Sequence, residues 1–178
     1  MTEYLQRMAR YNAWANRRLF AQVAELPGEM IAEDRGAFFG SILGTLNHIF
    51  VGDILWLGRF ASCEACMPIS PLGIIPAPTS LRDILFDEMT EFCAGRERLD
   101  ELIVDFSKMW DAELMPETIR YTDMGGRAQM GVLCELLQHM FNHQTHHRGQ
   151  VTTLLSQAGI NPAELDLLFM LREEEARA

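Results

Sequence analysis

The amino-acid sequence predicts an all-α fold: an up-and-down four-helix bundle with a small hairpin-like insert before the fourth long helix and an extra C-terminal helix. Two observations support this prediction. Four long stretches place apolar residues at the three- and four-residue steps of a helix, and a short extended segment with a glycine turn separates the third stretch from the fourth. The chain of 178 residues fits one domain with a substantial core, so residues 1–178 are predicted to form a single domain.

The first predicted helix runs from Thr2 to Leu26. Its apolar residues follow helical steps, Thr2 is a suitable N-cap, and Pro27-Gly28 is a stop signal. Residues 29–36 are mostly polar, which predicts an exposed connection to the next helix.

The second predicted helix, Phe38 to Phe60, is apolar on almost all sides, as expected for a helix that is buried on most of its circumference. His48 lies in its middle, where a hydrogen-bonded core histidine and a metal ligand are both reasonable interpretations. Asp53 needs a partner if it is buried, for example the ring N–H of a metal-binding histidine or a backbone donor. Three glycines in this helix indicate close helix contact or room for a ligand near the imidazole: Gly44, Gly52 and Gly58.

The next stretch, residues 61–79, carries four prolines and predicts a long irregular connection. It contains Cys63 and Cys66 in a CxxC motif. Without a second pair of cysteines or histidines this motif is a weak zinc signal, so we interpret the two residues as ordinary loop cysteines. Ser80 and Asp83 then resemble a helix capping box, which predicts a third helix from Ser80 to about Ile103.

The hairpin-like insert is predicted at residues 118–130, because extended segments flank a turn that contains Gly125 and Gly126. The fourth long helix is expected to span residues 131–158, with Gly159 as its C-cap signal. Asn161-Pro162 predicts the start of the C-terminal helix, since proline is favoured at the first position of a helix. We expect this last helix to fray after Arg172.

Four of the five histidines lie between residues 139 and 150. His143 and His147 are four residues apart, so a helix stacks them one turn apart and both rings can reach one ion. A third ligand has to come from elsewhere, and the one histidine outside this stretch is His48. This leads to the hypothesis that a single metal ion is held by His48, His143 and His147.

The composition excludes several classes of partner. Fifteen Lys and Arg residues against 25 Asp and Glu residues give a formal net charge of −10, which repels nucleic acid and anionic membrane surfaces. No run reaches the 18 or so apolar residues of a membrane span, and the N-terminus lacks the apolar region of a secretion signal. We therefore expect a cytoplasmic protein with reduced cysteines.

Five segments spread over the chain carry a family resemblance. They are YNAWANRRL (residues 11–19), LNHIFVGDILWLGR (46–59), RYTDMGGRAQM (120–130), HMFNHQTHHRGQV (139–151) and DLLFMLRE (166–173). Together they resemble the DinB-like family of metal-binding four-helix bundles, which includes YfiT-type hydrolases and thiol-dependent transferases. The resemblance covers nearly the whole chain and places the metal ligands at His48, His143 and His147, in agreement with the spacing argument. It also implies a homodimer.

The resemblance implies a metal-dependent enzyme that acts on a small molecule, either as a thiol S-transferase with a low-molecular-weight thiol or as a hydrolase. Three neutral imidazoles leave a divalent ion with its full charge and at least one open coordination position, which suits both reactions. Zinc, nickel, iron and manganese all accept imidazole, so the sequence does not select the metal. The alternative is a non-catalytic metal-binding protein with a sensor or interaction role in the stress response.

The sequence assigns no catalytic residue. Three residues are candidates for supporting the ligands: Asp53, His139 and Gln150. Gln150 falls on the same helix face as the ligands, whereas His139 lies one turn before His143 and is suited to a supporting or core position.

Overall fold

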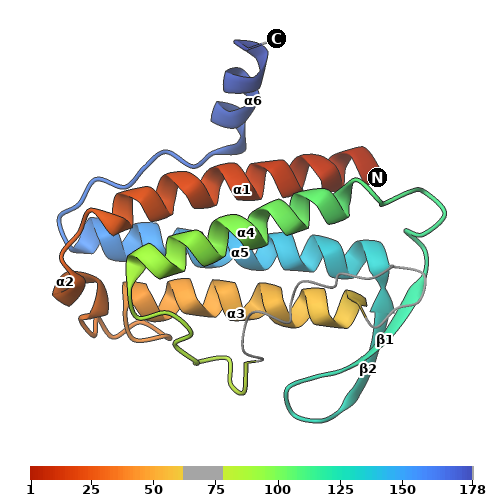
Figure 1. The fold of residues 1–178 in the computed structure, drawn as a ribbon, viewed down its shortest axis with the longest axis horizontal. Helices are drawn as coiled ribbons and strands as arrows, with labels where there is room; N and C mark the ends of the chain where they lie inside the picture. Colours follow the sequence, from red (N-terminus) through yellow and green to blue (C-terminus); the bar gives the residue numbers. More distant parts are fainter. Residues whose placement is uncertain (62–77, 178) are drawn as a thin grey trace.

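The computed structural model describes residues 1–61 and 78–177 (Figure 1). Within these residues the chain forms six α-helices and one two-stranded antiparallel sheet. In chain order the elements are α1 (Thr2–Ala24), α2 (Gly28–Ala32), α3 (Ile42–Ala61), α4 (Met89–Ser107), β1 (Thr118–Thr122), β2 (Ala128–Val132), α5 (Leu133–Gln157) and α6 (Leu167–Glu175). The interpretation of Cys63 and Cys66 concerns positions outside the described residues.

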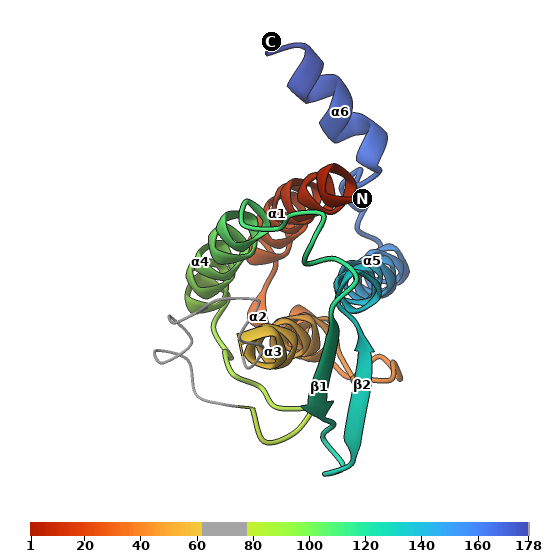
Figure 2. The same ribbon diagram turned by 90° about the vertical axis from the view of Figure 1, so that its right-hand side faces the viewer.

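The four long helices α1, α3, α4 and α5 pack side by side around one apolar core, which confirms the predicted all-α bundle (Figures 1 and 2). The directions of the helices differ from strict up-and-down alternation. Phe50 contacts Phe92 and Phe60 contacts Phe106, so α3 and α4 run in the same direction. Figure 1 shows α1 and α5 running in the opposite direction. The order of directions is therefore up, down, down, up.

These directions explain why the connection between α3 and α4 is long. The chain leaves α3 at one end of the bundle and enters α4 at the other end (Figure 1). It therefore has to cover the length of a 20-residue helix, about 30 Å. Bundles with such a crossover connection are an established variant of the four-helix architecture.

The helix α3 begins later than the predicted start at Phe38. The side-chain oxygen of Ser41 accepts a hydrogen bond from the backbone N–H of Gly44, so Ser41 is the N-cap. Gly40 has a φ of 79°, and this left-handed conformation turns the chain just before the helix. As a consequence Phe39 lies in a turn, where it contacts the site described below.

The helix α4 begins later than the predicted start at Ser80. The carboxylate of Asp83 does accept hydrogen bonds from the backbone N–H groups of Thr79 and Ser80, as in a capping box, but the chain forms a turn there. The reason is a tertiary contact with α3. The side-chain oxygen of Asn47 accepts hydrogen bonds from the backbone of residues 85–86 and so holds this segment outside a helix.

Two short helices complete the chain. The stretch predicted as a polar connection, residues 29–36, contains part of α2. The helix α6 begins after the predicted start at Asn161-Pro162, because Gln22 on α1 binds the carbonyl of Asn161 and the N–H of Ala163. It continues past Arg172, where fraying was predicted, and it projects away from the bundle (Figure 2).

The hairpin-like insert is confirmed. β1 and β2 pair antiparallel, with Thr118 opposite Val132 and Thr122 opposite Ala128, and β2 leads directly into α5. Gly159 follows α5 with a φ of 80°, as its C-cap signal predicted. No helix within residues 1–61 and 78–177 is long and apolar enough to cross a membrane.

Candidate metal centre

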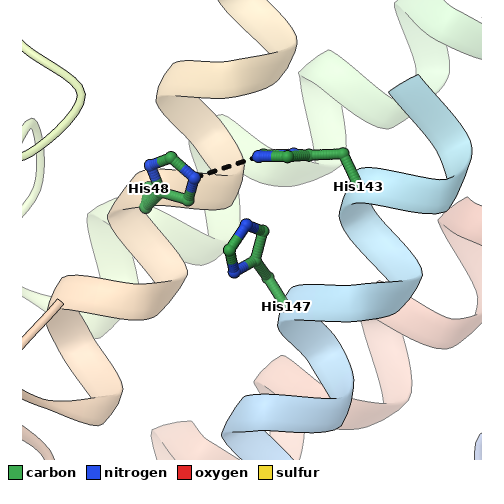
Figure 3. A group of neighbouring side chains, drawn as sticks. All are labelled: His48, His143 and His147. Carbon is green, nitrogen blue, oxygen red and sulfur yellow. Dashed lines mark hydrogen bonds between the residues drawn. The ribbon is translucent and has the colours of Figure 1, made fainter. Parts of the chain in front are cut away.

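Three histidines from two antiparallel helices meet in the bundle (Figure 3). His48 comes from α3, and His143 and His147 come from successive turns of α5. Their potential ligand nitrogens all lie within 4.8 Å of one another, and Nε2 of His48 is 3.0 Å from Nε2 of His143. Two nitrogens that bind one zinc ion at about 2.0–2.1 Å are roughly 3.3 Å apart in a tetrahedral site. The group could therefore hold a metal ion after small side-chain adjustments.

Gly52 allows α3 and α5 to approach closely beside this group. A Cβ at Gly52 would lie 2.8 Å from Cε1 of His143, which is closer than side chains pack, so the imidazole occupies the space of a missing side chain. Gly44 serves another contact, since a Cβ there would meet the backbone carbonyl of Phe39. A Cβ at Gly58 would meet open space. The expected room near an imidazole is thus found at Gly52 and not at Gly58.

Neighbouring oxygens determine which ring nitrogens carry protons. Nδ1 of His48 lies 2.9 Å from the carbonyl oxygen of Leu81. Nδ1 of His147 lies 2.7 Å from Oε1 of Gln150. Both oxygens only accept hydrogen bonds, so both Nδ1 atoms donate. In the neutral rings the Nε2 atoms then keep their lone pairs, which are the electrons that a metal ion would bind.

The surroundings hold the histidines in the neutral form. Burial lowers the pKa of His143 to about 3, and the neighbouring imidazoles add to this effect. Burial also lowers the pKa of His147 to about 4, although its hydrogen bond to Gln150 acts in the opposite direction. The pKa of His48 is lowered by burial and, to a smaller extent, by the positive charge of Arg82. Neutral imidazole is the form that binds metal ions.

The metal-free protein is expected to lose stability as the pH falls from about 6.5 towards 4. In the folded protein the pKa values of His143 and His147 lie below the ordinary value of 6.5, so the unfolded chain takes up protons in this range that the folded protein does not. Each such proton lowers the free energy of unfolding by up to about 1.4 kcal/mol per pH unit. Urea denaturation at a series of pH values measures this slope. His143→Asn removes one titrating group and should flatten it, and an unchanged slope would contradict the prediction.

Phe39 covers part of the site from the turn before α3. Its ring stacks on His48 with the centroids 3.7 Å apart and the planes 17° apart, and its centroid is 5.5 Å from that of His147. Sequence reasoning missed this contact because it placed Phe39 inside a continuous helix. The signal that could have found it is Gly40-Ser41, since glycine followed by serine is typical of a turn and an N-cap.

Two of the predicted supporting residues lie near the three histidines. Gln150 bridges two rings, because its Oε1 accepts from His147 and its Nε2 donates to Nε2 of His146 at 3.2 Å. His146 itself is exposed on the outer side of α5. His139 is also exposed, and its ring packs edge-on against Trp56 with the centroids 5.1 Å apart. Gln150 is thus placed to orient the ring of His147, a candidate metal ligand. His139 instead contacts the side chain of Trp56 at the edge of the site.

Asp53, the third predicted supporting residue, lies in a buried polar network. Nη1 of Arg96 donates to its Oδ2 at 2.5 Å, and Nε2 of Gln144 donates to its Oδ1 at 2.8 Å. Nη2 of Arg96 also donates to Asp100 at 2.7 Å, and all four side chains are buried. Burial raises the pKa of Asp53 to about 6 in spite of the opposing effect of Arg96. Because Gln144 directly follows one of the three histidines in the sequence, this network joins α3 to α5 beside the site.

Two cavities of the described part of the chain lie away from the three histidines. One, of about 540 Å³, lies between α1 and α4. The other, of about 370 Å³, lies between α5 and the segment before α6. Neither cavity is lined by a histidine.

Comparison with known proteins adds family membership to this geometry. The DinB family model matches residues 1–178, which is the whole chain. The protein DinB of Bacillus subtilis (strain 168) is 29% identical to this chain over 179 residues, which cover 99% of this chain and 100% of the relative. The chain therefore belongs to the DinB family.

Proposed function

We propose that this protein binds one divalent transition metal ion through His48, His143 and His147 and uses it to act on a small molecule, as a thiol S-transferase or a hydrolase. The observation that carries the proposal is the convergence of three imidazoles whose nitrogens lie within 4.8 Å of one another. Burial keeps these rings neutral and hence competent to bind a metal ion. Membership of the DinB family fits metal binding.

The residues around the histidines support the proposal of a catalytic metal site. The carbonyl of Leu81 orients His48, and the side chain of Gln150 orients His147. Among the residues that the structure describes, the group has three members, whereas structural zinc sites normally use four protein ligands. Zinc, nickel, iron and manganese all suit such a set. The metal would supply Lewis-acid chemistry, which activates water for hydrolysis or a thiol for transfer.

A non-catalytic role, as a metal-binding sensor or interaction protein, is the second candidate. Neither of the two cavities described above could hold a substrate at the histidines, because both lie away from them. Enzymes that act on small molecules usually enclose the substrate in a pocket at the reacting group. The two candidates therefore differ in whether a bound metal supports turnover.

Replacing His143 by alanine is expected to reduce the metal content of the purified protein from about one ion per chain to a small fraction of that, because two imidazoles alone bind a divalent ion weakly. Elemental analysis after incubation with metal and gel filtration measures this. His139→Ala is the matched control, since His139 lies on the same helix one turn away and outside the group of three. Equal metal content in the wild type and in His143→Ala would overturn the assignment.

Metal-dependent turnover distinguishes the enzymatic proposal from the non-catalytic sensor or interaction role. The metal-loaded protein is assayed with activated esters for hydrolysis, and with electrophiles plus a panel of small thiols for transfer. Turnover that requires both the metal and His143 would support the enzymatic proposal. A protein that loads metal but shows no metal-dependent turnover across the panel would favour the sensor or interaction role.

A further inference from the structure

Arg82 lies beside the candidate metal centre, with its guanidinium group over the exposed ring of Phe38 and near the half-buried ring of Phe39. Its guanidinium carbon is 4.7 Å from the ring centroid of Phe38 and 5.5 Å from that of Phe39. Phe39 in turn stacks on His48, so one aromatic ring separates the positive charge from a proposed metal ligand. The preceding residue, Leu81, accepts the Nδ1 hydrogen bond of His48 through its backbone carbonyl. The position of Arg82 is therefore tied to the site through both its backbone and its side chain.

Within residues 1–61 and 78–177, the guanidinium N–H groups of Arg82 form no hydrogen bond or ion pair. A guanidinium group carries its N–H donors in one plane. It can therefore bind a carboxylate or another anion through two parallel hydrogen bonds. The side chain is exposed, so these donors are accessible to a small molecule at the surface.

The charge of Arg82 has no carboxylate partner among residues 1–61 and 78–177. The chain has 25 acidic residues, and several exposed arginines do form ion pairs: Arg10 with Glu174, Arg18 with Glu173 and Arg127 with Asp123. In a protein of net charge −10, a cation near the histidines locally reverses the repulsion of anions. Arg82 is thus placed to attract a negative group that the described part of the protein does not supply.

Apolar surface lies next to this charge. The side chain of Phe38 is 71% exposed and that of Leu81 is 43% exposed. Large exposed apolar groups at one place often mark a binding surface. A ligand that bridged Arg82 and the histidines would pass over these side chains.

We propose that Arg82 binds an anionic group of the substrate or co-substrate while the reacting end of the same molecule lies at the three histidines. The ligand class is a small molecule with a carboxylate or similar anion at one end, a thiol or other metal-directed group at the other, and an apolar stem that contacts Phe38. This inference rests on the proposed function, because it requires a metal ion at the three histidines.

The binding of two matched thiols to the Co²⁺-loaded protein tests the role of Arg82. A thiolate on Co²⁺ produces a charge-transfer absorption band, so binding is measured without turnover. 3-Mercaptopropionate carries a carboxylate, and 3-mercapto-1-propanol has the same length without the charge. The wild type is expected to bind the carboxylate about tenfold more tightly, which corresponds to about 1.4 kcal/mol. Arg82→Gln should lose this preference and keep both its Co²⁺ content and its affinity for the uncharged thiol.

Arg98→Gln is the charge-matched control, because Arg98 is exposed on α4, which carries none of the three histidines. It is expected to keep the preference for the carboxylate. A wild type that binds both thiols equally, or a preference that persists in Arg82→Gln, would overturn the role of Arg82 and leave the metal site standing. A wild type that takes up no Co²⁺ would overturn the metal site and this inference together.

Discussion

Replacing Asp53 by alanine is expected to lower the free energy of unfolding by about 3–5 kcal/mol at neutral pH. The carboxylate accepts from Arg96 on α4 and from Gln144 on α5, and it is fully buried. Its removal leaves one guanidinium nitrogen and one amide nitrogen without their acceptor inside the bundle. Each unsatisfied buried donor costs about 1–3 kcal/mol, and more where the donor is charged. Urea denaturation of the metal-free protein measures the change.

Asp105→Ala is the control for loss of a carboxylate at the surface. Asp105 pairs with Lys108 at 2.7 Å, but the two side chains are 71% and 69% exposed. Such an exposed pair contributes about 0–1 kcal/mol, so this variant should be nearly as stable as the wild type. A loss of 1 kcal/mol or less in Asp53→Ala as well would show that the buried network stabilises the bundle no more than a surface pair.

Replacing Gly52 by alanine is expected to weaken metal binding about 10- to 100-fold, which is the effect of disturbing the support of a metal ligand. The new methyl group would meet Cε1 of His143 at 2.8 Å, so the imidazole has to move. Because the obstructing atom belongs to a side chain that can rotate, the metal-free protein should fold. Its stability should change by about 1 kcal/mol or less, as the gain in helix propensity offsets part of the crowding. Competition with a chromogenic chelator measures the affinity.

Gly58→Ala is the matched control in the same helix. A Cβ at Gly58 meets open space, so this variant should gain up to about 1 kcal/mol of stability and bind metal as the wild type does. The pair of variants separates a general effect of alanine in α3 from a specific effect on His143. Wild-type affinity in Gly52→Ala would show that the ring of His143 does not need the space it occupies.

The candidate metal ligands could be predicted from the sequence because the relative position of two of them depends only on their spacing along one helix. The spacing of His143 and His147 places them one turn apart on any α-helix. His48 was reached by elimination and by family resemblance, and it is the packing of α3 against α5 at Gly52 that brings it within 3.0 Å of His143. Local periodicity predicts which residues share a helix face, but it does not predict which faces meet.

For three helices, local signals in the sequence predicted the wrong starting residue. Local signals at Phe38, Ser80 and Pro162 predicted helix starts that the structure places later in the chain. For α4 and α6 the cause is a polar side chain from another helix, Asn47 or Gln22, which binds backbone groups that would otherwise enter the helix. Such contacts between distant residues are invisible to a pattern read along the chain.

The sequence by itself determined the helical bundle, the hairpin before α5 and the shared helix face of His143 and His147, because periodicity and turn residues are local properties. The tertiary structure alone decided that α4 runs parallel to α3, that Asp53 pairs with Arg96, and that Phe39 and Arg82 lie beside His48. Each of these depends on side chains that are distant in sequence and compete for the same space or the same hydrogen-bonding partner.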